Sequence, residues 1–451
     1  MPTFADIFKL HMKTLRLISY AAISLIMAVS CGKKDPDIDP DLPSEPCTPE
    51  ESKEIIEDAL VKLTDAIDSK DIEKINDYAS TVSETTSNSN TENLEEWISE
   101  ALEKVQKYSE YYATKANVYE VSDFEATYSL STISGHFELV GNEWKCSKAD
   151  DLLLKFKDEK GKDCEISLVG SGKSSTIMIE DCFDSDEYDQ DWDGDGIISE
   201  WEKGGYYNEN GDYVKGYRDK MKVSVTVPEN IKLTAKYGSE KYVDVQLKTS
   251  FNVNGALNIE DYEINVPAVN SAVASISGDF NLLDYNLNLS EFSKNAGKGA
   301  FSASFKKGKE LLASAKMDID GFKVTDDVDN DVEINKMTVD FDVVGDLQVK
   351  GSLYSEAFKA ETYDPRNEAQ VREIADKISK AMDLGIYFGS NVKQASVKVA
   401  PYFDEGYWDY EPVLVFDDGT SYSFEEYFNE NDFSELLDKL EELFEIFEDF
   451  S

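Results

Sequence analysis

The amino-acid sequence predicts an α+β protein in which one or more large antiparallel β-sheets pack against amphipathic helices near the N- and C-termini. Three observations support this fold class. Apolar residues recur at helical spacing in residues 48–118, alternate with polar residues in residues 119–190 and 212–360, and return to helical spacing at the C-terminal end. Helical spacing places apolar side chains on one face of a helix, whereas alternation places them on one face of a strand.

The helical segment, residues 48–118, begins at a recognisable cap. Thr48 is followed by Pro49 and, three positions after the cap, by Glu51, which is the pattern of a capping box with proline at the first helical position. An apolar stripe at helical spacing follows: Ile55, Ile56, Ala59, Leu60, Leu63 and Ile67. We expect a second amphipathic helix from Leu94 onward, joined to the first by a linker rich in Ser, Thr and Asn.

Two β regions follow the helices. Residues 119–190 form strand-like runs separated by turn signals such as Gly141-Asn142, which predicts an antiparallel meander. The glycine-rich residues 170–174 are predicted to form a further hairpin turn. Residues 212–360 continue the alternation with one apolar face and one face of Lys, Asp, Ser and Thr, so we expect a sheet with one solvated side.

Residues 364–451 are expected to contain a helix, short strands and an acidic C-terminal amphipathic helix. The first helix should start at Asp364 and stop at Gly385. Strand-like runs follow near residues 395–399 and 412–416. The last helix carries its apolar residues at helical spacing: Phe433, Leu436, Leu437, Leu440, Leu443, Phe444 and Phe447.

Composition excludes several classes of function. The 451 residues include 45 Lys and Arg against 92 Asp and Glu, a net charge of -47. This charge repels phosphate, which argues against nucleic acid as a partner and favours cations. Only two His are present, which argues against zinc sites built from imidazole and against most Ser-His or Cys-His catalysis.

The N-terminus carries a targeting pattern. Lys13 and Arg16 precede the apolar residues 17–29, a stretch too short for a comfortable membrane span. Small residues then stand immediately before Cys31. This arrangement resembles the lipobox of bacterial lipoproteins, in which the cysteine thiol carries a diacylglycerol.

That resemblance implies the organisation of the first 47 residues and the location of the protein. Residues 1–30 would be a lipoprotein signal peptide, and Cys31 the lipid-bearing first residue of the mature chain. Residues 31–47, rich in Pro and Asp, would form a flexible tether. The protein would be an exported bacterial lipoprotein of the outer membrane, facing either the periplasm or the cell surface.

The most specific motif is the twelve-residue stretch 191–202. Its six predicted metal ligands are Asp191, Asp193, Asp195, Ile197, Ser199 and Glu202. Gly196 permits a sharp turn, Ile197 offers its backbone carbonyl, Ser199 can hold a water and Glu202 can supply two oxygens. This stretch resembles the EF-hand calcium loop, which implies Ca²⁺ as the bound ion.

A calcium loop between two β regions would join the meander to the larger sheet as a structural staple. An affinity of ~10⁻⁴ to 10⁻³ M would suit that role. The alternative interpretation is an acidic surface turn without a metal. A second acidic alternation at Asp327, Asp329, Asp331 and Glu333 has Val332 in place of the turn glycine, so either a solvated hairpin tip or a second metal site remains open.

Two groups of residues have more than one interpretation. Four further cysteines, Cys47, Cys146, Cys164 and Cys182, allow three disulfide pairings or four free thiols. An aromatic cluster includes Tyr402, Phe403, Tyr407, Trp408 and Tyr410. It is expected to pack in the core or a hairpin, with stacking on sugar rings as the alternative.

These observations predict a noncatalytic binding or structural module, not an enzyme, whose protein or glycan partner the sequence does not name. One rival is a carrier of a lipid or another apolar ligand, which requires a continuous cavity lined by residues such as Val223, Val245 and Phe341. Another is a glycan-binding or glycan-active protein, whose mark would be two inward carboxylates with perturbed pKa values in a cleft.

Overall fold

The computed structural model describes two compact units. Unit 1 comprises Met1–Tyr78, Ser277–Lys323 and Val332–Ser451, and unit 2 comprises Ala79–Ile276 and Val324–Asp331. The structure describes residues 43–90, 92–93, 124–132, 134–183, 205–207, 213–215, 219–260, 263–264, 266–324, 332–359, 363–389, 391–404, 406–429, 432–437 and 439. The fold is a large, mostly antiparallel open β-sheet with a few helices, consistent with the predicted α+β class.

The sheet strands of unit 1 follow one another in chain order. Its strands are β13 (Tyr285–Asn295), β14 (Gly297–Lys307), β15 (Glu310–Val324), β16 (Val332–Glu333), β17 (Lys336–Val343), β18 (Leu347–Tyr354), β19 (Met382–Phe388), β20 (Val392–Asp404), β21 (Tyr407–Phe416) and β22 (Ser421–Ser423). β15 pairs with β17, and from β13 to β15 and from β17 to β22 each strand pairs antiparallel with the next. The predicted strands near residues 395–399 and 412–416 are confirmed as parts of β20 and β21.

The strand register places apolar and polar side chains on opposite faces of this sheet. One cross-strand row is entirely apolar: Ala315, Phe341, Val349, Ile386, Ala395 and Phe416. The neighbouring row begins with Lys316, Asp340 and Lys350. Because successive side chains of a strand point to opposite faces, the second row belongs to a solvated polar face.

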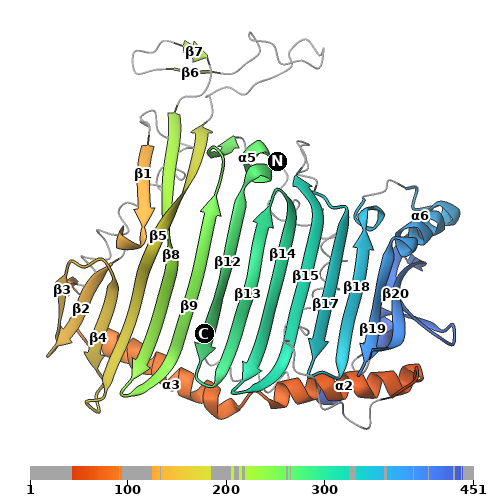
Figure 1. Ribbon diagram of the computed structural model, residues 1–451, viewed down its shortest axis with the longest axis horizontal. Helices are drawn as coiled ribbons and strands as arrows, with labels where there is room; N and C mark the ends of the chain where they lie inside the picture. The colour runs from red at the N-terminus through yellow and green to blue at the C-terminus, as the bar shows by residue number, and fades with distance from the viewer. Residues whose placement is uncertain are drawn as a thin grey trace. The chain divides into compact units, whose positions relative to one another are not determined.

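Helical residues share a hydrophobic cluster with the apolar face of unit 1. Helix α2 (Pro49–Asp65) has the predicted capping box and buries Ile56, Ala59 and Leu60. Helix α6 (Glu368–Lys380) buries Val371, and α7 (Phe424–Tyr427) buries Tyr427. The cluster includes α2 residues together with Phe341 and Phe388 of the strands. Figure 1 shows α2 running across the strands of this unit near their ends.

Two predicted helix boundaries were wrong. Asn367, not Asp364, caps α6, because its side-chain oxygen accepts the Gln370 N–H at 3.3 Å. The helix ends at Lys380, and Gly385 lies within β19, where a Cβ would come within 2.8 Å of the Ala395 carbonyl oxygen. Helix α3 (Ser69–Ser87) also occupies part of the predicted linker.

Unit 2 is built around two long strands. Its elements are β1 (Phe124–Ser129), η1 (Leu130–Thr132), β2 (Gly135–Val140), β3 (Glu143–Ser147), β4 (Leu152–Lys157), β5 (Asp163–Phe183), β6 (Gly205–Tyr207), β7 (Tyr213–Lys215), β8 (Asp219–Tyr237), β9 (Glu240–Asn252), β10 (Leu257–Glu260), β11 (Glu263–Ile264) and α5 (Val266–Ser271). β12 (Val273–Leu282) crosses the boundary between the units. β5 and β8 pair antiparallel from Cys164–Tyr237 to Phe183–Asp219.

The meander prediction holds only in part for unit 2. The turn at Gly141-Asn142 joins the antiparallel strands β2 and β3 as expected. However, β1 pairs parallel with β8, β2 with β4, and β10 with β5. The predicted hairpin turn at residues 170–174 was wrong, because these residues lie inside β5 as an irregularity between Ser171 and Ser174. Gly172 accommodates it with a φ of +85°.

Candidate functional site

The predicted calcium ligands lie outside the described residues, but the strands that precede and follow this part of the chain are described. Asp191, Asp193, Asp195, Ile197, Ser199 and Glu202 belong to the connection between β5 and β8. The two ends of that connection meet, because Phe183 is the strand partner of Asp219. Within the connection, β6 and β7 form a separate two-stranded antiparallel ribbon. A metal bound in residues 191–202 would therefore brace a loop whose two ends are already paired strands.

The other predicted metal residues do not assemble in the described part of the chain. Asp327, Asp329 and Asp331 lie outside it, whereas Glu333 forms an exposed ion pair with Lys323 at 3.7 Å. The residues that the structure describes contain no group of three or more His, Cys, Asp or Glu that could hold a metal ion.

The predicted lipidation site, Cys31, also lies outside the described residues, but the last residue of the predicted tether, Cys47, is described. The backbone N–H and the thiol of Cys47 both donate to Oε1 of Gln394, at 2.9 and 3.1 Å. Gln394 is buried and belongs to β20. Cys47, the last residue of the predicted tether, therefore contacts the sheet of unit 1. Among the described residues, no helix has the length and apolar character that spanning a membrane requires.

Three of the four remaining cysteines have described side chains, and all three are free thiols: Cys47, Cys146 and Cys164. Burial, the largest cause, raises the pKa of Cys164 to about 11. A protonated, buried thiol is a poor nucleophile, so Cys164 fits a packing role and not a redox role.

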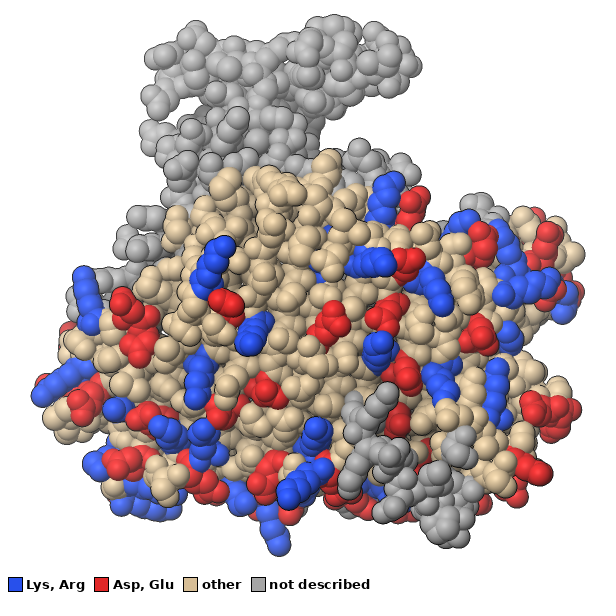
Figure 2. Space-filling model, viewed as in Figure 1, with Lys and Arg blue, Asp and Glu red and all other residues tan. Residues whose placement is uncertain are grey.

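The polar face of unit 1 carries both signs of charge. Lys298 pairs with Asp320 at 3.7 Å and Lys316 with Asp318 at 3.0 Å, all of them substantially exposed. Figure 2 shows lysine, arginine and acidic side chains interspersed over the face in view. The large negative net charge is therefore locally balanced on this part of the sheet.

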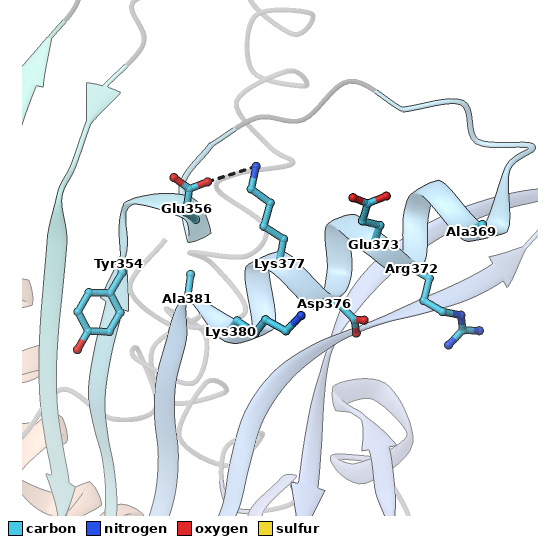
Figure 3. A pocket seen from close by; sticks show the side chains of 9 residues that line it. All are labelled: Tyr354, Glu356, Ala369, Arg372, Glu373, Asp376, Lys377, Lys380 and Ala381. Carbon is cyan, nitrogen blue, oxygen red and sulfur yellow. Dashed lines mark ion pairs between the residues drawn. The ribbon is translucent and has the colours of Figure 1, made fainter.

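A shallow pocket of about 740 Å³ lies beside α6 and η2 (Ser355–Ala357) and is shown in Figure 3. Its lining residues are Tyr354, Glu356, Ala369, Arg372, Glu373, Asp376, Lys377, Lys380 and Ala381. Glu356 accepts ion pairs from Lys359 at 2.5 Å and Lys377 at 3.2 Å, and the hydrogen bonds from these lysines lower the pKa of its carboxyl. The carboxylate is therefore paired with two lysines, and its ionised form is favoured.

A second pocket of about 380 Å³ lies on the polar face between β13 and β17, and Lys298, Asp318 and Lys336 are among its lining residues. Neither pocket is lined by Val223, Val245 or Phe341. Phe341 is 2% exposed within the hydrophobic cluster of unit 1, whereas Val223 and Val245 belong to unit 2.

One described carboxyl group has a raised pKa. Burial raises the pKa of Glu411 on β21, and the neighbouring charges of Glu426 and then Glu425 raise it further. Glu411 lines neither of the two pockets described above. A glycan-active site is expected to place two inward carboxylates together in a cleft. Glu411 does not form such a pair with the carboxylates that line these two pockets.

The predicted aromatic cluster occupies the hairpin of β20 and β21, which was one of the two expected places, and three of its rings are exposed there. Tyr402, Phe403 and Tyr407 are exposed. Trp408 and Tyr410 are half-buried. Sequence reasoning missed Tyr363, which lies against Tyr410 with ring centroids 5.7 Å apart. The available signal was the position of Tyr363 before Asp364-Pro365. A residue that precedes proline favours extended backbone, so this segment can run along a neighbouring strand.

Comparison with models of protein families, with curated proteins and with solved structures found no match to this chain.

Proposed function

We propose that the chain is an exported bacterial lipoprotein that acts as a noncatalytic binding or structural module and that binds calcium in residues 191–202. In this proposal a lipid on Cys31 anchors the protein to the outer membrane. The N- and C-terminal helices pack on the apolar face of the sheet, and the calcium loop joins two β regions. Calcium stabilises that loop and does not act in a reaction.

The observation that carries the calcium proposal is the donor set of the loop. Asp191, Asp193, Asp195 and Glu202 bring four carboxylates into one twelve-residue segment, with Gly196 at the turn. Calcium takes six to eight oxygen ligands at about 2.3–2.6 Å, which a loop of this kind can supply. Without a cation the same carboxylates repel one another at close range. A bound divalent ion therefore stabilises the loop by replacing repulsion with attraction.

Calcium uptake is tested by calorimetric titration of the purified chain after dialysis against chelator. We expect one binding event with a dissociation constant of ~10⁻⁴ to 10⁻³ M or tighter. Replacing Glu202 with Gln removes a charged bidentate ligand but keeps its size, so the affinity should fall by at least about tenfold. Absence of uptake at millimolar calcium would refute the proposal.

The anchor is tested separately by growing bacteria that express the chain with radiolabelled palmitate. We expect the label to enter the protein and the Cys31→Ser variant to lose it. The thiol is required because it forms the thioether that carries the diacylglycerol, and several acyl chains give lasting attachment. Labelling that persists in the Cys31→Ser variant would contradict lipidation at this residue.

A glycan-binding module is the second candidate, favoured by one observation. Phe403 and Tyr407 expose aromatic rings of the kind that stack on sugars. The apolar-carrier alternative has less support, because Phe341 is enclosed by side chains of the unit 1 cluster and not by a cavity wall.

A further inference from the structure

The tip of the β20–β21 hairpin exposes neighbouring aromatic rings. Phe403 is 57% exposed, Tyr407 50% and Tyr402 37%. Burying a large apolar side chain fully is worth roughly 1.5–3 kcal/mol relative to leaving it in water. The folded chain gains only part of that stabilisation at these three nearby positions. Clustered exposure of this kind marks a surface that a partner covers.

Contacts within unit 1 order the Phe403 ring and the strand β21 beside it before a partner binds. Phe403 is the strand partner of Trp408, and their ring centroids are 5.1 Å apart. The Trp408 backbone N–H donates to the Pro365 carbonyl oxygen at 2.6 Å. The Tyr363 hydroxyl donates to Oδ1 of Asp409 at 2.5 Å. A surface that is already ordered loses little conformational entropy on binding.

The tip of the same hairpin is negatively charged, and the two lysines of β20, Lys393 and Lys398, lie earlier in the strand. Residues 399–438 contain no lysine or arginine. Among the described residues, Asp404, Asp409 and Glu411 form no ion pair. Arg366, which follows the Pro365 that contacts the hairpin, also forms no ion pair with a described residue. The exposed carboxylate of Asp404 therefore remains available to an external cation.

The polar face of the same unit is different, since its lysines neutralise its carboxylates, as in the pair Lys316–Asp318. Burial, Glu426 and Glu425 raise the pKa of Glu411, in that order of importance. A cationic partner would relieve this repulsion, whereas an uncharged partner would not.

We propose that the tip of the β20–β21 hairpin is a docking surface for a basic segment of a protein partner. Lysine or arginine side chains of that segment lie against the rings of Phe403 and Tyr407 and pair with the carboxylate of Asp404. Cations bind aromatic faces, and the pairing is stronger when a carboxylate also meets the cation. A membrane of anionic lipids is disfavoured because the hairpin would repel it. A glycan would use the rings but leave the negative charge uncompensated.

This inference deepens the proposed binding module by naming the chemistry of its partner, and it does not require calcium. The test uses the purified full chain and two fluorescent peptides, one of alternating lysine and glycine and one with glutamine in place of lysine. We expect the lysine peptide to bind at low salt, to bind more weakly as salt increases, and the glutamine peptide not to bind.

Substitutions locate the binding surface. The double variant Phe403→Ala, Tyr407→Ala should weaken binding about tenfold, since each exposed cation–π contact is worth about 0.5–1 kcal/mol. Asp404→Asn should weaken it severalfold. Phe292→Ala is the matched aromatic control, because Phe292 is 50% exposed in the same unit. Asp417→Asn removes the same charge from the exposed turn between β21 and β22. Both controls should change the affinity less than about twofold.

Three results would overturn the inference: no binding of the lysine peptide at low salt, equal losses from Asp404→Asn and Asp417→Asn, or binding of oligosaccharides that depends on Phe403. The second would indicate only a net-charge effect, and the third would assign the rings to glycans. Circular dichroism of the double variant establishes that it is folded. A chain that takes up calcium but fails these peptide tests would refute this inference alone.

Discussion

Replacing Phe388 with Ala should lower the free energy of unfolding of unit 1 by about 3–5 kcal/mol. Phe388 is 0% exposed and lies in the hydrophobic cluster that also contains residues of α2 and α6. The substitution removes a complete ring from a close-packed site and leaves a cavity that the surrounding strands cannot fully close. Urea unfolding followed by circular dichroism measures the change as a lower midpoint.

Phe292→Ala is the control for that measurement, because the same atoms are removed from a ring that is 50% exposed. We expect a change within about 0.5 kcal/mol. If the two alanine variants unfolded at the same urea concentration as the parent chain, the cluster around Phe388 would not be the stabilising core of unit 1.

Removing calcium should lower the melting temperature of the protein by several degrees. A ligand that binds only the folded state stabilises it by about 2.7 kcal/mol when its concentration is 100 times the dissociation constant. Asp191→Ala removes a predicted ligand and should abolish the stabilisation by calcium. Thermal unfolding with calcium and with chelator gives the difference directly.

Asp327→Ala distinguishes the proposed loop from the second acidic stretch. It removes one carboxylate from a segment in which Val332 replaces the turn glycine, so its effect on the melting temperature should be much smaller than that of Asp191→Ala. Equal and negligible shifts in both variants would contradict a calcium staple at residues 191–202.

Local patterns predicted the elements whose information lies within a few residues. The capping box at Thr48 and Glu51 defines the start of α2, and both of its reciprocal hydrogen bonds form. Alternation predicted the strands of unit 1, because one buried face imposes a period of two on each strand. The apolar row that includes Phe341 and Ile386 shows that separate alternating segments align into one face.

Long-range pairing was not predictable from those patterns. Gly385 has the local character of a helix stop, but the pairing of β19 with β18 and β20 places it inside a strand. The parallel pairing of β1 with β8 joins residues separated by about a hundred positions. Neither the pairing of β19 nor that of β1 can be predicted from the neighbouring sequence, because each depends on which strands meet after the chain folds.

The hairpin aromatics illustrate the same limit at a candidate site. Phe403 and Trp408 have the composition of core residues, and burial is the commonest state for such rings. The exposure of Phe403 follows from the length of β20 and β21, which carries the hairpin tip beyond the residues of the hydrophobic cluster. The charge of residues 399–438, by contrast, is readable directly from the sequence.

The most direct test of the calcium loop is hydrogen exchange with and without calcium, because it reports position as well as binding. The proposal predicts that calcium slows exchange in residues 191–202 and at the paired ends of β5 and β8, around Phe183 and Asp219, while leaving β17 to β19 unchanged. Identical exchange at those paired ends and in the loop at millimolar calcium would contradict it.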